Sequence, residues 1–164
     1  MRAAAIAVVL LTTAANVPAE NTARGERPGA ASAGTGARRL LDAIKADDPA
    51  LAAGFFFPAD AFDLVKDLPV PGRYHRKLMA WYGEDIHAAH ALYRDVGSLA
   101  FDRFELGRCR WMEKGTEGNK LPYWSCSRNA LFAKTGGKTR RFDVHVVINW
   151  GRDWYVTHLG PIRN

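Results

Sequence analysis

Three histidines and three carboxylates lie within one stretch, HRKLMAWYGEDIHAAHALYRD, which begins at His75. Such residue types can bind a metal ion or exchange protons with a substrate. Within the stretch, Glu84, His87 and His90 follow i, i+3, i+6 spacing. Metal-binding helices instead place two histidines at i and i+4, so that both face one ion. We therefore predict that these side chains form a solvated helix surface, and we expect no metal and no cofactor.

Asp85 differs from its neighbours because it lies on the apolar side of the predicted helix, between Trp81 and Ala89. A carboxylate there needs a partner or a raised pKa. The favoured interpretation is a buried ion pair, or a bond to a backbone or serine donor. The alternative is a polar group at the floor of a pocket, with Asp85 as general base. His75 shares this face, but it lies about 15 Å away along a straight helix, so the two cannot touch.

Arg128, His145 and His158 form a second candidate group if a two-residue turn joins the last two strands. The two histidines would then be direct cross-strand neighbours, with Arg128 beside them. Two imidazoles could share a metal ion, but the guanidinium disfavours it, and we expect a solvent-facing polar row. The sequence has no Gly-rich phosphate loop, no G-x-S-x-G elbow and no CxxC motif.

Helical spacing of apolar residues precedes the strands in this chain. One stripe contains Leu40, Leu41 and Ile44, and Asp48-Pro49 then suits the start of a further helical turn. A long helix is predicted from Arg73 to Val96, with Gly97 as its stop. Four extended runs follow, about 99–114, 121–134, 139–150 and 154–160, separated by short turn sequences. This order predicts an α+β fold, with N-terminal helices and one long helix packed on a four-stranded antiparallel meander.

Cys109 and Cys126 are the only cysteines, and they test the register of the first hairpin. A turn between Glu117 and Gly118 places the two directly opposite each other on neighbouring strands. Two cysteines in an exported chain normally pair, and this placement is within disulfide reach. The turn and the cysteines support the same register, so we predict a structural disulfide.

Turns at Gly136-Gly137 and Gly151-Arg152 extend this register to the whole sheet and assign residues to its two faces. One face carries Trp111, Trp124, Asn149 and Trp154, which we interpret as a dimer face in preference to a ligand platform. The other face carries polar groups among apolar ones. The candidate ligand-binding residues are Tyr123, Ser125, Ser127, Asn129 and Thr157 from this face, with His75, Tyr82 and Asp85 from the helix.

The first residues are typical of a secretory signal peptide, with Arg2, an apolar run to Leu11 and a small-x-small site before Glu20. We therefore expect a signal peptide over 1–19, a disordered Gly/Ala/Ser-rich linker over 20–36 and a single domain over 37–162. The mature protein would be secreted or periplasmic, without a membrane segment. The formal net charge of +6 is scattered along the chain, so a nucleic-acid partner is not expected.

The order of elements resembles the nuclear transport factor 2-like, or SnoaL-like, cone fold, and also small exported bacterial proteins of unknown function. LLDAIKADDPALAAGFF is similar to the first helices of that group, VPGRYHRKLMAWY to the entry of its long helix, and WGRDWYVTHLGP to its closing strand. A helix around 55–62 would depart from the pattern, where an early strand is usual. Enzymes of this fold often present an Asp–His pair in the cone, and the resemblance suggests Asp85 for that aspartate, with no histidine matched to it.

Three functions are compatible with these residues. The leading hypothesis is an exported, non-catalytic domain that binds a small ligand or a protein partner through the cone. The first alternative is a small isomerase or hydrolase with Asp85 as its base. The second is a structural dimeric module of the cell envelope, which would pair through a face of the sheet.

Overall fold

Residues 21–163 are described by a computed structural model of the chain. The expected signal peptide over 1–19 lies outside these residues. The helical elements, in chain order, are α1 (Ala31–Ala46), η1 (Pro49–Phe55), α2 (Ala59–Val65), α3 (Pro71–Ala91) and η2 (Val96–Ser98). As expected, Asp48 begins a helical turn, and its carboxylate accepts the Ala50 N–H at 3.0 Å. No helix in residues 21–163 is long and apolar enough to cross a membrane.

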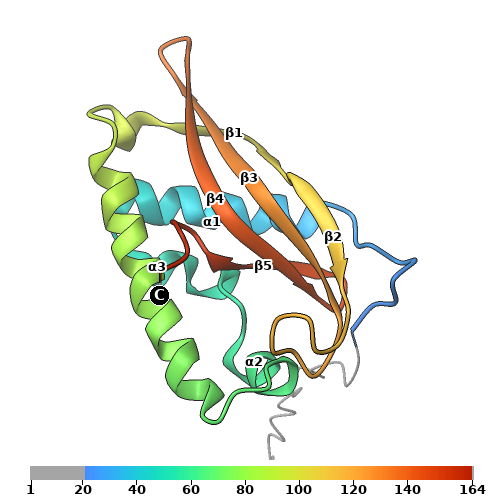
Figure 1. The fold of residues 1–164 in the computed structure, drawn as a ribbon. Helices are drawn as coiled ribbons and strands as arrows, with labels where there is room; N and C mark the ends of the chain where they lie inside the picture. Colours follow the sequence, from blue (N-terminus) through green and yellow to red (C-terminus); the bar gives the residue numbers. More distant parts are fainter. Residues whose placement is uncertain (1–20, 164) are drawn as a thin grey trace, which may run out of the picture.

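The strands form one antiparallel sheet, which confirms the α+β class. They are β1 (Ala100–Glu105), β2 (Arg108–Met112), β3 (Tyr123–Thr135), β4 (Lys138–Trp150) and β5 (Asp153–His158). The order is β1-β3-β4-β5, and β2 also pairs with β3. The sheet is the expected meander, except that the first strand is divided into two segments. Figure 1 shows α1 crossing behind the strands and α3 standing beside them.

The predicted register is confirmed in all three hairpins near their turns. Cys109 lies opposite Cys126, with Cα atoms 3.9 Å apart, and the two are disulfide-bonded. Thr135 pairs with Lys138, and Trp150 pairs with Asp153.

The first strand is divided because the backbone bends at Leu106–Gly107. Arg128, on the opposing strand, has a φ of 60°, a left-handed conformation that interrupts the extended chain. The buried Asn129 amide fills the gap, where its Oδ1 accepts the Gly107 N–H at 3.0 Å. Its Nδ2 donates to the carbonyl oxygens of Cys126 and Val144. Asn129 therefore replaces the missing ladder bonds at the bend.

A bulge near the end of β5 changes which residues lie side by side. The register shifts between Val147 and Val146, so that His158 pairs with Val146. The expected pairing of His158 with His145 is therefore wrong, and the expected polar row with Arg128 does not form. One extra residue in a strand moves the following side chains to the other face, and this is the physical reason for the difference.

The prediction of a disordered linker over 20–36 is wrong for residues 31–36, because α1 begins at Ala31 and buries Ala33, Gly36 and Ala37. Small residues looked unable to bury surface, but here they permit close packing. A Cβ at Gly36 would overlap the ring of Phe55, which packs against the helix at that point. The buried face of the first turns of α1 is therefore made of Ala and Gly, and larger apolar residues follow from Leu40 onward.

The segment before α1 also packs on the sheet and covers part of the tryptophan face. Asn21 donates to the Asn149 carbonyl at 3.1 Å, and the Trp154 indole donates to the Gly29 carbonyl at 2.9 Å. Trp111 and Trp124 remain partly exposed, with ring centroids 5.7 Å apart. Asn149 and Trp154, the other two residues of this face, are buried. Pairing of two chains through the exposed parts of Trp111 and Trp124 stays a prediction.

The long helix is shorter than expected. It ends at Ala91 rather than at Gly97, and Leu92, which follows it, is 59% exposed. Its buried residues are Leu78, Tyr82 and Ile86. After the helix, Tyr93 packs against Phe142 of the sheet, and the chain then passes through η2 into β1.

Candidate functional site

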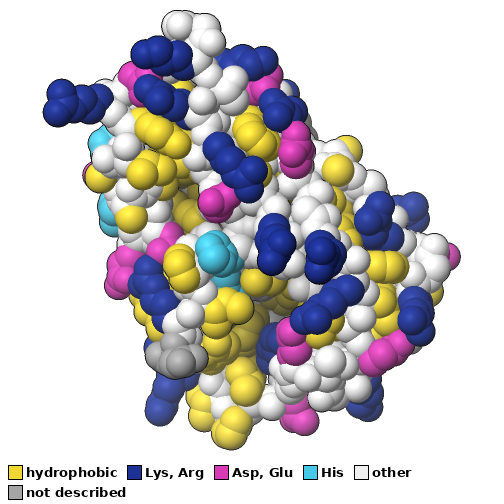
Figure 2. Space-filling model, turned by 45° about the horizontal axis from the view of Figure 1, so that its top comes forward, with side chains coloured by type: hydrophobic (Ala, Val, Ile, Leu, Met, Phe, Trp, Pro, Cys, Tyr) yellow, Lys and Arg dark blue, Asp and Glu magenta, His cyan; other side chains and the backbone are white. Residues whose placement is uncertain are grey.

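A cavity of about 420 Å³ lies between α2, α3 and the sheet. Its walls come from helices, strands, the β2–β3 loop and the C-terminal segment. The lining residues are Phe62, Lys66, Leu68, Tyr74, Leu78, Arg110, Glu117, Tyr123, Ser125, Ser127, Val146, Ile148, Thr157, His158 and Ile162. Figure 2 shows a hollow with hydrophobic side chains at its floor and Lys and Arg side chains beside it.

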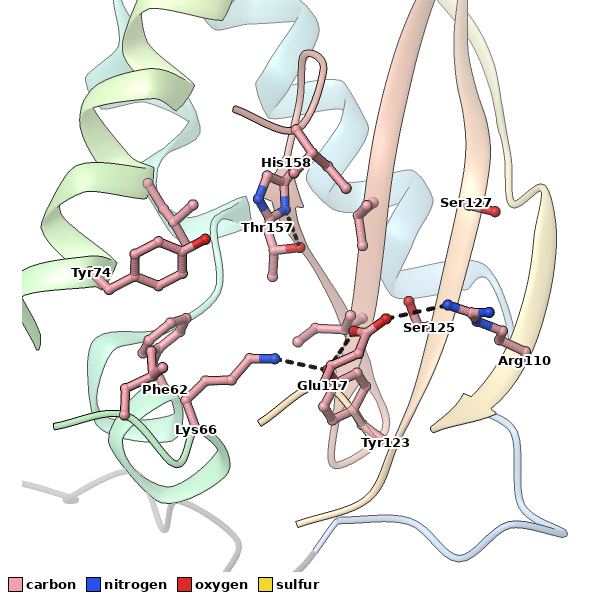
Figure 3. Close-up of a pocket in the computed structure, with 15 residues that line it drawn as sticks. Phe62, Lys66, Tyr74, Arg110, Glu117, Tyr123, Ser125, Ser127, Thr157 and His158 are labelled. Carbon is pink, nitrogen blue, oxygen red and sulfur yellow. Dashed lines mark hydrogen bonds and ion pairs between the residues drawn. The ribbon is translucent and has the colours of Figure 1, made fainter. Parts of the chain in front are cut away.

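The polar groups of the cavity form a connected chain at one side. Lys66 Nζ donates to the Tyr123 hydroxyl at 2.9 Å. That hydroxyl donates to Glu117 Oε2 at 3.2 Å, and Arg110 donates to Glu117 Oε1, also at 3.2 Å. Figure 3 shows Lys66 approaching from the helix side, with Arg110 on the strand side. Two cations and one carboxylate thus meet around a tyrosine.

Lys66 and Glu117 are brought together because the end of α2 docks on the β2–β3 loop. The backbones of Lys66 and Asn119 form an isolated antiparallel β-bridge, and the Asp67 N–H donates to the Gly118 carbonyl at 2.7 Å. The buried Asn119 side chain holds the loop in shape, because its Oδ1 accepts the Glu117 N–H at 3.0 Å. The position of both charged groups is therefore fixed by backbone contacts.

Burial dominates the electrostatics of this chain of polar groups. Desolvation lowers the pKa of Lys66 below its ordinary value, and the charge of Glu117 opposes that shift. Desolvation also raises the pKa of Tyr123, with Glu117 adding to the effect. Tyr123 is therefore a protonated donor at neutral pH. Among the described residues, no carboxylate oxygen lies within 4.0 Å of Lys66 Nζ. Arg110, by contrast, forms an ion pair with Glu117.

His158 faces the same cavity from β5. Its Nδ1 lies 3.2 Å from the Thr157 hydroxyl, while its Nε2 is buried and has no hydrogen-bond partner within residues 21–163. Burial lowers the pKa of His158, and the nearby charge of Lys66 lowers it further. The imidazole is therefore uncharged at neutral pH, and its unpartnered Nε2 is enclosed by protein.

The structure brings together only part of the predicted ligand set. Tyr123, Ser125, Ser127 and Thr157 line the cavity, as the register placed them on one face. Asn129 does not, because its amide is used at the strand bend.

The three helix residues of the predicted set also lie outside the cavity lining. His75 Nε2 lies 2.7 Å from the Phe57 carbonyl, and the Tyr82 hydroxyl donates to the Ala52 carbonyl at 3.3 Å. Asp85 accepts the Gly160 N–H at 2.8 Å and pairs with Arg163. Its environment matches the ion pair and backbone bond that the sequence favoured.

The remaining histidines of α3 hold the end of α1. His87 Nδ1 lies 2.6 Å from Asp47 Oδ1, and His90 Nδ1 lies 2.8 Å from the Ile44 carbonyl. The polar side chains of the stretch that begins at His75 therefore attach other segments to the long helix. Within residues 21–163, no group of three or more His, Cys, Asp or Glu side chains is arranged to hold a metal ion.

Sequence reasoning missed Lys66, Arg110 and Glu117, and it placed His158 on the other face. Arg110 was predictable from the sequence, because the confirmed register sets it opposite Ser125. Lys66 and Glu117 come from a helix end and a turn that are distant in sequence, and no local pattern connects them.

No family model matches the sequence, and neither the curated proteins nor the solved structures contain a match. The α+β class is therefore defined by the structure itself. The resemblance to the nuclear transport factor 2-like fold stays a prediction.

Proposed function

We propose that this protein is a non-catalytic binding domain for a small, largely apolar molecule, which occupies the cavity between α2, α3 and the sheet. The cavity volume of about 420 Å³ carries this proposal. Pockets of roughly 300–1,000 Å³ with apolar walls and a few polar groups are typical of small-molecule sites. Phe62, Leu78 and Ile148 supply the walls, and the polar groups gather mainly around Tyr123.

The engagement of Asp85 favours binding over the enzyme alternative. One carboxylate oxygen accepts the Gly160 N–H, and the other pairs with Arg163. A general base needs a free oxygen within reach of the substrate proton. Among the described residues, no hydrogen bond joins Asp85 to a histidine, so the expected Asp–His pair has no support here.

Fluorescence of N-phenyl-1-naphthylamine, a neutral apolar probe, tests the proposal. We expect saturable binding to the wild type and a loss of affinity of at least about tenfold in Ser125→Phe, whose ring would occupy the cavity. Thr139→Phe is the matched control, because Thr139 is exposed on the β3–β4 hairpin away from the cavity. Absence of saturable binding in the wild type, or equal affinities in the two variants, would contradict the proposal.

We further propose that the chain is exported. The signal-like pattern over 1–19 and the disulfide both support it, because disulfides persist in oxidising compartments. Mass spectrometry of the protein isolated from its source organism tests this. The expected mature chain begins at Glu20, and an intact leader with two free thiols would refute it.

A further inference from the structure

We propose that the ligand is an amphipathic anion, whose negatively charged head lies against Lys66 and whose apolar body lies against the walls formed by Phe62 and Leu78. This inference rests on the proposed binding function and specifies the class of ligand. It is carried by the charges of the cavity. The charged side chains in the lining are Lys66, Arg110 and Glu117, so the cavity has an excess of one positive charge when His158 is neutral.

The excess charge is located on Lys66. Glu117 is engaged on both oxygens, one by Arg110 and one by the Tyr123 hydroxyl. Lys66 has three N–H donors, and within residues 21–163 its only hydrogen-bond acceptor is the Tyr123 hydroxyl. A half-buried ammonium is costly in an apolar setting unless it is paired with an opposite charge. An anion in the cavity would accept hydrogen bonds from Lys66 and offset its charge.

The same geometry disfavours a cationic head group. Lys66 and Arg110 flank the one carboxylate, so a cation that approaches Glu117 also approaches two positive charges. A neutral head group would leave the charge of Lys66 uncompensated. The ligand chemistry that fits best is therefore a single carboxylate or sulfonate on an apolar body.

His158 lines the same cavity from β5, and Figure 3 shows His158 and Lys66 approaching the cavity from different elements. Its Nε2 is enclosed by protein and has no hydrogen-bond partner within residues 21–163, so this nitrogen is not open to a ligand in the cavity. The charge of Lys66 therefore decides the class of head group.

Two probes with the same aromatic scaffold separate the charge from the apolar body. They are 1-anilinonaphthalene-8-sulfonate, which is anionic, and N-phenyl-1-naphthylamine, which lacks the sulfonate. In Lys66→Met we expect the affinity for the sulfonate to fall at least about tenfold, as for loss of a hydrogen bond to a charged group. The affinity for the neutral probe stays within about twofold of wild type. Lys138→Met, at the exposed start of β4, leaves both affinities unchanged.

A competition experiment extends the test to simple amphiphiles. Dodecanoate is expected to displace the neutral probe at least about tenfold more effectively than dodecan-1-ol in the wild type, and this preference disappears in Lys66→Met. Lys66→Gln replaces the methionine variant if thermal melting shows that the latter is unfolded. If the wild type binds neither aromatic probe, the proposed function fails together with this inference. If the wild type binds the neutral probe, but substitution of Lys66 changes the affinities for both probes equally or changes neither affinity, the binding function stands. The assignment of the ligand as an anion is then refuted.

Discussion

Asp85 and Gly160 are joined by a 2.8 Å hydrogen bond that ties the C-terminal segment to the long helix. The approach is close, because a Cβ at Gly160 would lie 2.5 Å from Asp85 Oδ1. Arg163 pairs with the same carboxylate and also with Glu84. Between these two attachments lies Ile162, which forms part of the cavity wall. Asp85 therefore acts on the site indirectly, by holding one of its walls.

Substitution of Asp85 is expected to destabilise the fold. In Asp85→Ala the Gly160 N–H and the Arg163 guanidinium lose their acceptor, and we expect the free energy of unfolding to fall by about 2 kcal/mol. Arg163→Ala removes only a partly exposed ion pair, and its effect is expected to be below about 1 kcal/mol. Urea unfolding of both variants measures the difference.

Asp63→Ala is the control, since Asp63 is exposed on α2. It should leave the unfolding midpoint unchanged. An Asp85→Ala protein as stable as wild type would show that the carboxylate is dispensable for the attachment of the tail.

The bend between β1 and β2 depends on a single amide. Asn129→Ala would leave the Gly107 N–H and the carbonyl oxygens of Cys126 and Val144 without their partner. Each buried polar group that loses its bond costs about 1–3 kcal/mol, so we expect a loss of about 3 kcal/mol in total. Chemical denaturation is the measurement. Ser127→Ala, an exposed neighbour, should change stability by less than about 0.5 kcal/mol, and equal effects of the two substitutions would contradict the assignment.

The disulfide is expected to stabilise the first hairpin. It joins cysteines 17 residues apart, and cross-links that close loops of this size contribute about 3 kcal/mol. Reduction of the wild type should therefore lower the free energy of unfolding by about that amount. The double variant Cys109→Ala/Cys126→Ala should be equally destabilised and should not respond to reductant. A thiol assay that finds two free cysteines in the native protein would contradict this prediction.

The hairpins were predictable because two independent local signals agreed. Turn residues such as Gly136-Gly137 fixed where each strand reverses, and the Cys109–Cys126 pair fixed the register. Side-chain alternation then placed Tyr123 and its neighbours on the cavity face without any knowledge of the helices.

What the sequence did not reveal depends on backbone irregularity and on distant contacts. One bulge in β5 moved His158 to the cavity face, and bulges have no strong signature in a single sequence. The role of Asp85 became definite only with Arg163, because several partners were compatible with its place on the helix. The start of α1 was hidden because Ala and Gly are common both in linkers and in close-packed helices.

The affinity for an anionic ligand is expected to depend on the ionisation of Lys66. Desolvation lowers the pKa of Lys66 from its ordinary value of 10.5, so the ammonium loses its proton at a lower pH than an exposed lysine does. The protonated form attracts the anion. Binding is therefore strongest below the lowered pKa and weakens as the pH rises through it, before pH 10.5 is reached. Tyr123 does not interfere over this range, because burial raises its pKa above the ordinary value of 10.0.

Titration of the wild type with 1-anilinonaphthalene-8-sulfonate between pH 7 and about pH 10 measures this effect. The neutral probe N-phenyl-1-naphthylamine, followed over the same range, reports any general loosening of the fold, and its affinity should stay constant. In Lys66→Met the pH dependence for the sulfonate should disappear. A decline of the same size in that variant would assign the effect to another group and remove Lys66 from the binding of the anion.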